Sequence, residues 1–234
     1  MEPIKGIRTL IFDADDTLWK NNFYFVEATE AFIAMWVAAG MEESAARQAF
    51  LEFEKKAVRE RGYGSENFLY ILQGLWERLS PRYPAPPQTM EQIIERFKEH
   101  RSNGPVLFEG VKETMTELAR RYALYVLTKG RYDEQKGKII RAGIDKLVRD
   151  YFIVPEKDIT VYRELLASHN WSSEQVCMVG NSPKSDINPA LACGMHAVYI
   201  PYEHTWHLDH DAVSDPHHPR LRTLKTFREL TGIL

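Results

Sequence analysis

The amino-acid sequence predicts an α/β fold, in which a doubly wound, mostly parallel sheet has helices on both faces and carries an all-helical insertion. Two observations lead to this prediction. Short apolar runs with the length of buried strands alternate with segments of helical periodicity through most of the chain. One long stretch, residues 20–104, breaks that alternation, because it contains helical patterns and no clear strand.

Five apolar runs are the predicted strands of the sheet. They are continuous rather than alternating, which is typical of strands that are covered on both faces. The segments between them carry apolar residues at helical spacing, as Val111, Met115 and Leu118 do. This strand–helix alternation favours a parallel sheet. The predicted strands are residues 7–12, 123–127, 151–154, 176–179 and 197–200.

Four helices are predicted in the insertion. The first begins near Asn22, and the second covers residues 43–61. Ser65 is the expected N-cap of the third helix, and Thr89 begins a capping-box pattern before the fourth. The helical pattern stops at residues 103–105, where the sequence reads Asn-Gly-Pro.

The breaks at the two ends of the insertion divide the chain into two predicted domains. A chain of 234 residues is long enough for one α/β domain with a second, smaller domain inserted into it. The predicted domains are an α/β core of residues 1–19 and 105–234 and an all-helical domain of residues 20–104.

The composition is that of an ordinary globular protein, with 44% hydrophobic and 27% charged residues. A net charge of -3 offers no general attraction for nucleic acid or for an anionic membrane. No apolar run is long enough to cross a bilayer, and the first residues lack the layout of a secretory signal. Cys177 and Cys193 fit no zinc spacing, and we expect them to be reduced core residues of a cytoplasmic protein.

Acidic residues follow the first predicted strand directly. Asp13 and Asp15 stand where that strand ends, and buried carboxylates need compensation for their lost solvation. Ligands bind at this end of the strands in open parallel sheets. The two-residue spacing would point both side chains the same way, as alternate residues of a strand do. A hard divalent cation such as Mg²⁺, which prefers oxygen ligands, would compensate the charge.

Residues 13–17, with the pattern Asp-x-Asp-x-Thr after an apolar strand, resemble the first motif of the haloacid dehalogenase (HAD) superfamily. Thr128, at the end of the second predicted strand, matches the second motif, a lone Ser or Thr. Lys157, just before a helix predicted near Ile159, looks like the third motif. Residues 180–186 resemble the fourth, an acidic metal-binding loop. The motifs occur in the family's order along the whole chain, and the insertion falls where one large branch of the family carries a helical cap.

The resemblance implies a role for each matched residue. Asp13 would be the nucleophile that attacks phosphorus and forms a phosphoaspartate. Asp15 would protonate the leaving oxygen and then deprotonate the attacking water. Thr128 would donate a hydrogen bond to a phosphoryl oxygen, and Lys157 would neutralise negative charge on that group. Asp186 would hold Mg²⁺ together with the Asp13 carboxylate and the backbone carbonyl of Asp15.

The function that the resemblance implies is that of a magnesium-dependent phosphatase acting on a small phosphorylated metabolite, with its site between a Rossmann-like core and the cap. A phosphomutase would share the first step and pass the phosphoryl group to a sugar. A haloacid dehalogenase would attack carbon without a metal and would lack the second acid, Asp15. A non-catalytic binding protein on the same fold is the remaining alternative, and the presence of both Asp13 and Asp15 argues against it.

Two further features bear on metal binding. The fourth motif of the family often has Asp after its Gly, but this chain has Asn181. Asparagine keeps an oxygen without the charge, so we expect a functional but weaker magnesium site, with Asn181 beside the metal ligands. Five of the eight histidines lie between His204 and His218. Prolines interrupt this segment and its spacings fit no helix face, which favours a surface loop over a metal site.

Overall fold

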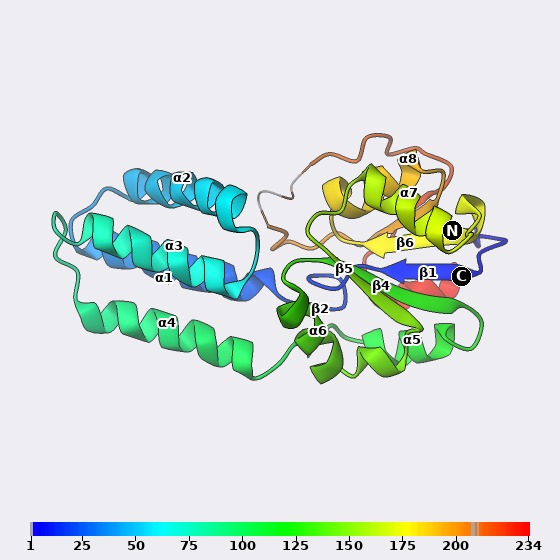
Figure 1. The fold of residues 1–234 in the computed structure, drawn as a ribbon, viewed down its shortest axis with the longest axis horizontal. Helices are drawn as coiled ribbons and strands as arrows, with labels where there is room; N and C mark the ends of the chain where they lie inside the picture. The colour runs from blue at the N-terminus through cyan, green and yellow to red at the C-terminus, as the bar shows by residue number, and fades with distance from the viewer. Residues whose placement is uncertain (1, 207–208, 210) are drawn as a thin grey trace. The chain divides into compact units, whose positions relative to one another are not determined.

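The computed structural model describes residues 2–206, 209 and 211–234. The chain divides into two compact units. One contains Pro105–Leu234 together with the N-terminal residues up to Asn22, and the other is Phe23–Gly104 (Figure 1).

A six-stranded sheet forms the centre of the first unit, with the strand order β5-β4-β1-β6-β7-β8 and parallel pairing throughout. β1 is central because it pairs with β4 on one side and with β6 on the other, and Phe12 is level with both Val126 and Val179. The chain builds the sheet outward in both directions from β1, which confirms the predicted doubly wound α/β fold. The strands are β1 (Thr9–Phe12), β4 (Ala123–Lys129), β5 (Asp150–Val154), β6 (Val176–Gly180), β7 (His196–Tyr199) and β8 (Leu221–Thr223).

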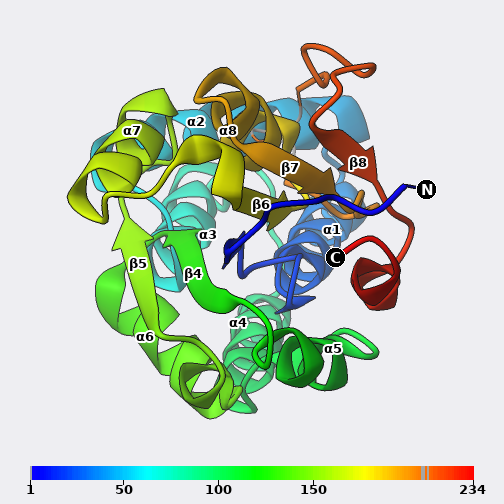
Figure 2. The same cartoon turned by 90° about the vertical axis from the view of Figure 1, so that its right-hand side faces the viewer.

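Alternate residues of the central strands face two apolar clusters, one on each side of the sheet. Leu10 and Phe12 pack in a cluster with side chains of α5 and α6, whereas Ile11 packs in a cluster with side chains of α7 and α8. Figure 2 shows these two pairs of helices on opposite faces. Because both faces are covered, every residue of β1 and β6 is buried. The helices are α5 (Val111–Leu118), α6 (Tyr132–Arg141), α7 (Ile159–Ser168) and α8 (Asn188–Ala192).

The second unit is built from helices around an apolar core that is rich in aromatic side chains. Phe68 packs on Phe97 with ring centroids 4.8 Å apart, and Trp36 packs on Trp76 at 5.4 Å. None of the described helices, in either unit, is long and apolar enough to cross a membrane. The helices of this unit are α1 (Asn22–Ala38), α2 (Glu43–Arg61), α3 (Ser65–Leu79) and α4 (Pro87–Ser102).

Two very short strands flank the helical unit. β2 (Trp19–Lys20) precedes α1, and β3 (Val106–Leu107) follows α4. They form an antiparallel pair in which Trp19 is level with Leu107. Backbone hydrogen bonds therefore join the segment that leads into α1 to the segment that follows α4.

Two predicted helix caps are wrong, although the predicted helix of residues 43–61 coincides with α2. Gly64 is the N-cap of α3, and Ser65 is already the first residue of that helix. α4 already begins at Pro87, before Thr89. Proline suits the first position of a helix because its φ is fixed and its missing N–H would be unpaired there. The capping-box pattern at Thr89 therefore lies within the first turn.

Candidate active site

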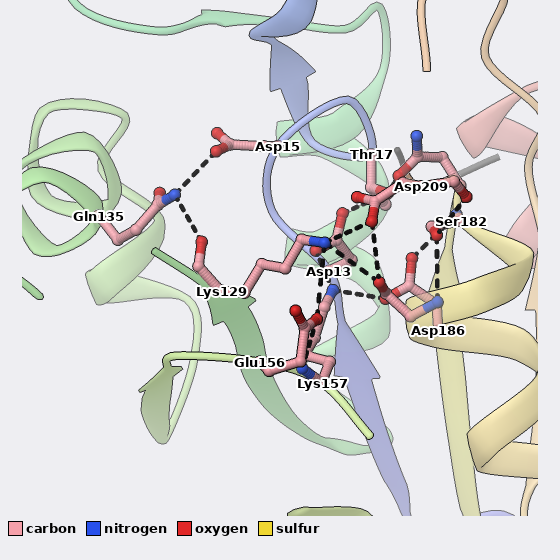
Figure 3. A network of polar contacts seen from close by, with 12 residues as sticks. Asp13, Asp15, Thr17, Lys129, Gln135, Glu156, Lys157, Ser182, Asp186 and Asp209 are labelled. Carbon is pink, nitrogen blue, oxygen red and sulfur yellow. Dashed lines mark hydrogen bonds and ion pairs between the residues drawn. The ribbon is translucent and has the colours of Figure 1, made fainter. Parts of the chain in front are cut away.

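The residues predicted to form the site lie at one edge of the sheet. Asp13 follows β1, Thr128 is near the end of β4, Lys157 lies beyond β5 and Asp186 lies beyond β6. Because neighbouring parallel strands end at the same edge, the loops that carry these residues meet there. Figure 3 shows the resulting network of polar contacts.

Asp13, Lys157 and Asp186 form a buried centre. The Lys157 Nζ atom lies 2.5 Å from Asp13 Oδ1 and 2.5 Å from Asp186 Oδ1. All three side chains are buried, and Asp186 is 0% exposed. The ammonium group thus joins carboxylates from two different strand ends, which brings together three of the predicted site residues.

The charge of this centre is unbalanced, because two carboxylates face one ammonium group. The pKa of Asp13 is raised from 3.8 to about 7, mainly by burial. The charge of Lys157 lowers this pKa, and the negative charge of Asp186 contributes to raising it. Burial would lower the pKa of Lys157, but the two carboxylates raise it above its ordinary value. The two carboxyl groups therefore keep Lys157 in its charged form, while burial favours the neutral form of Asp13.

The loop after β6 fixes the orientation of Asp186. The Ser182 backbone N–H donates to Asp186 Oδ2 at 3.0 Å, while the other oxygen accepts from Lys157. Asp186 lies in a π-helical turn, Pro183–Ile187, at whose start Ser182 Oγ accepts from the Ser185 N–H. The carboxylate lies so close to Gly180 that a Cβ at that position would overlap it. A glycine at the end of β6 is therefore required by this packing.

Thr17 and Asn181 complete the surroundings of Asp13. The Thr17 hydroxyl lies 2.9 Å from Asp13 Oδ2 and 3.2 Å from Asn181 Oδ1, both of which can accept its proton. Asn181 Nδ2 donates to Thr205 Oγ1 at 3.0 Å. Thr128 is buried near the end of β4, two residues beyond Val126, the last residue of β4 that pairs with β1.

Asp15 points in a different direction from Asp13. Its carboxylate accepts from Trp19 Nε1 at 2.6 Å, from Gln135 Nε2 at 2.8 Å and from Lys138 Nζ at 2.7 Å. Figure 3 shows it turned toward α6, away from Lys157. The expectation that the two acids point the same way is wrong, because β1 ends at Phe12 and the strand alternation does not continue beyond it.

The turn that follows Asp15 depends on Asp16. This residue has a left-handed backbone conformation, with φ at 63°, and its Oδ1 accepts from the backbone N–H groups of Asn21 and Asn22 at 2.9 and 3.0 Å. Burial raises its pKa from 3.8 to about 8, against the effect of these hydrogen bonds. Asp16 thus shapes the loop and does not face the buried centre.

The structure adds residues that the sequence analysis did not identify. Lys129 Nζ lies 2.5 Å from Asp209 Oδ1 and 3.3 Å from Ser185 Oγ. Asp209 and Thr205 come from the stretch between β7 and β8 and contact the loop after β6. No sequence signal indicated these contacts, because they join residues that are distant in sequence.

The predicted surface loop at 204–218 is only partly described, since His207 and His210 lie outside the described residues. The backbone carbonyl of His204 accepts from Asn22 Nδ2 at 2.6 Å. Within the part of the chain that the structure describes, no group of three or more His, Cys, Asp or Glu side chains is arranged to hold a metal ion. The convergence at the sheet edge consists of two carboxylates, Asp13 and Asp186.

The fold and this centre define a class of protein: a doubly wound α/β enzyme with a buried lysine–carboxylate site at the carboxyl ends of its strands. Residues 7–194 match the haloacid dehalogenase-like hydrolases, and the chain belongs to this family. The resemblance seen in the four motifs is thereby confirmed, and the protein is a hydrolase.

Relatives match between about half and nearly all of the chain. A glyceraldehyde 3-phosphate phosphatase of Pyrococcus furiosus is 27% identical over 209 residues, covering 85% of this chain and 82% of the relative. A phosphoserine phosphatase of Thermus thermophilus is 28% identical over 120 residues, covering 49% of this chain and 48% of the relative. A haloacid dehalogenase-like family hydrolase from Xanthomonas campestris superposes with a TM-score of 0.80 at 28% identity, covering 97% of this chain and 94% of that one.

Proposed function

We propose that the protein is a magnesium-dependent phosphatase that hydrolyses a small phosphorylated metabolite through a phosphoaspartate on Asp13. The observation that carries this proposal is the buried centre of Asp13, Lys157 and Asp186 at the carboxyl edge of the sheet. The names of the relatives support it, since two of them are phosphatases of small phosphorylated molecules.

The residues present fit a magnesium ion. Asp13 and Asp186 lie close together, since one oxygen of each is 2.5 Å from the same Lys157 Nζ. When all three groups are ionised they carry one excess negative charge, which a divalent cation would compensate. The donors are oxygen atoms, as Mg²⁺ prefers. Asp13, Asp186 and the backbone carbonyl of Asp15 would hold the ion, with Asn181 beside them. Bound there, the ion would neutralise and orient the phosphoryl oxygens.

The chain's own residues would carry the chemistry in two steps. Asp13 attacks phosphorus and displaces the leaving oxygen, to which Asp15 gives its proton. Asp15, now ionised, takes a proton from water, and the resulting hydroxide displaces Asp13 from phosphorus, releasing phosphate. Lys157 and the Thr128 hydroxyl would stabilise the charge on the transferring group. The hydrogen bond from Thr17 and the ion pair with Lys157 hold Asp13 at both oxygens.

Two of the alternatives differ from this proposal at Asp15. A dehalogenase that attacks carbon has no leaving oxygen to protonate, and a binding protein has no need of an acid at all. In the proposed reaction the Asp15 carboxylate, which accepts from three side chains, has a defined part as acid and base.

We further propose that the helical insertion, residues 20–104, acts as a cap that selects small substrates. The apolar core of the insertion is separate from that of the α/β unit, so the sequence of the insertion can change without disturbing the α/β core. Efficient hydrolysis of a folded phosphoprotein would count strongly against a role in limiting substrate size.

The experiment that tests the function compares wild type with Asp13→Asn, each with and without Mg²⁺, on an aryl phosphate. We expect hydrolysis that requires both Asp13 and the metal ion, with a loss in the variant of about a thousandfold or more, since the nucleophile is removed. Equal hydrolysis by Asp13→Asn would refute the phosphoaspartate mechanism. Hydrolysis that is unchanged by a chelator would refute the magnesium requirement.

A further inference from the structure

Helix α6 supplies two buried polar side chains that belong to none of the four motifs. Lys138 is 4% exposed and Gln135 is 5% exposed. A buried ammonium group loses solvation that a charged partner must restore, so the identity of its partner is informative. Lys138 Nζ lies 2.7 and 2.8 Å from the two oxygens of Asp15, and 3.0 Å from Asn21 Oδ1.

Gln135 is oriented by the backbone as well as by Asp15. Its Nε2 donates to Asp15 Oδ2 at 2.8 Å and to the backbone oxygen of Lys129 at 2.9 Å. Because a backbone carbonyl can only accept, the amide cannot be reversed. Its Oε1 is a buried atom without a hydrogen-bond partner, so the orientation that serves Asp15 leaves one acceptor unsatisfied.

The backbone of the preceding loop makes room for this amide. Gly130 has a φ of +136°, and a Cβ there would lie 2.9 Å from Gln135 Nε2. Gly130 follows Lys129, and Lys129 follows Thr128 at the end of β4. Gln135 therefore links the position of Asp15 to the end of β4, where another predicted site residue, Thr128, lies.

The direction of Asp15 suits the reaction. In an in-line displacement the attacking and leaving oxygens lie on opposite sides of phosphorus, so the acid must stand apart from the nucleophile. Asp13 is held by Thr17 and Lys157, whereas Asp15 is held by residues of α6 and by Trp19. Separate sets of partners keep the two carboxylates turned apart (Figure 3).

We propose that Lys138 and Gln135 are positioning residues for Asp15, fixing the direction of its carboxylate and thereby controlling proton transfer to the leaving oxygen. This inference rests on the proposed function, in which Asp15 is the acid and base. Trp19 also holds Asp15, but its ring is fully buried in the core, so its replacement would test packing instead.

The test uses Lys138→Met and Gln135→Leu, with Lys138→Arg as the conservative variant and Asp15→Asn as the reference. Lys136→Met is the matched control, since Lys136 lies on the same helix and packs over the Tyr132 ring. For each, kcat/KM is measured on a series of aryl and alkyl phosphates whose leaving groups differ in basicity. Protonation matters most for the most basic leaving groups, so a misplaced acid steepens this dependence.

We expect Lys138→Met to lose about tenfold or more activity on alkyl phosphates beyond any loss on aryl phosphates with weakly basic leaving groups. Gln135→Leu should change the leaving-group dependence in the same direction, and Asp15→Asn should change it further. Lys138→Arg should keep most of the activity that Lys138→Met loses. Lys136→Met should match wild type. The inference is overturned if Lys138→Met and Gln135→Leu keep the wild-type dependence, even when both are slower on every substrate.

Failure of the inference is distinguishable from failure of the proposed function. If Asp13→Asn keeps its activity, the proposed function fails whatever the α6 variants do. If Asp13 is essential but the leaving-group dependence is unchanged in both α6 variants, only the positioning role fails. Crystal structures give a readout without activity: a displaced Asp15 carboxylate in Lys138→Met or Gln135→Leu supports the inference, and an unmoved one contradicts it.

Discussion

Asp16 stands between the proposed acid and the rest of the first motif, yet its contacts are those of a structural residue. Its left-handed conformation turns the chain, and its carboxylate accepts the N–H groups of Asn21 and Asn22 where α1 begins. Burial raises its pKa from 3.8 to about 8. The ordinary value of 3.8 applies to the unfolded chain, so the folded protein binds this proton more tightly than the unfolded chain does.

This difference predicts a pH-dependent effect of Asp16→Asn on stability. Since the folded pKa is the higher one, the contribution of Asp16 is most favourable below about pH 4 and is lost as the pH rises to about 8. Asparagine keeps the acceptor and tolerates the left-handed conformation without the charge. As the pH rises between these values, we expect the unfolding free energy of the variant to increase by on the order of a few kcal/mol relative to that of wild type. Urea unfolding of both proteins, in buffers that contain a chelator, measures this difference in stability. Equal slopes of unfolding free energy against pH for the two proteins would contradict the prediction.

Asn181 gives a prediction about metal affinity. Asn181→Asp adds a negative charge beside Thr17 and Asp13, so we expect the Mg²⁺ concentration for half-maximal activity to fall about tenfold, as for roughly 1.4 kcal/mol of added attraction. A magnesium titration of activity measures this. Gln175→Glu is the control, because it adds the same charge immediately before β6, at the end away from the site. An unchanged titration in Asn181→Asp would mean that position 181 does not influence the ion.

At the scale of secondary-structure elements, the junction between β6 and its π-helical turn is the tightest part of the site. Every residue of β6 is buried, and the chain then turns so that Asp186 lies back against Gly180. The last residue of the strand thus determines where the carboxylate can lie.

Gly180→Ala should therefore displace Asp186. The added methyl group would overlap the carboxylate, and such overpacking typically costs about 1–3 kcal/mol. We expect reduced stability together with reduced activity, because the ion pair with Lys157 is disturbed. Gly232→Ala is the control, since a Cβ there meets nothing within 4 Å. Denaturant unfolding and aryl phosphate hydrolysis would be measured on both variants, and a fully active, fully stable Gly180→Ala would refute the argument.

The elements that were predicted from sequence are those with a strong local pattern. β1 is apolar from Leu10 to Phe12 and β6 from Val176 to Val179, because both faces of the sheet are covered. The buried residues of α2 recur at helical spacing, at positions 46, 50, 54 and 57. β2, β3 and β8 were missed because they have two or three residues each, too few for a period. The grouping of Asp13, Lys157 and Asp186 was expected from the resemblance of their motifs to those of the family.

The direction of Asp15 and the part played by α6 could not be predicted in this way. Lys138 and Asp15 are 123 positions apart, and a lysine in an amphipathic helix has the same local pattern whether it is buried or exposed. Its burial depends on how α6 packs against the loop after β1, which is a property of the tertiary structure. Long-range polar contacts of this kind leave no periodic signal in a single sequence.

For the molecule as a whole, the pairing of β2 with β3 has an evolutionary consequence. Trp19 and Leu107 lie opposite each other, so the chain leaves the core and returns to it at neighbouring positions, as at the two ends of a short hairpin loop. Domain insertion is tolerated best where the two ends lie close together. An ancestor could therefore exchange its inserted segment for a shorter, longer or unrelated one without rebuilding the sheet. Selection for new substrates could then act on the inserted segment while the reaction centre was inherited unchanged.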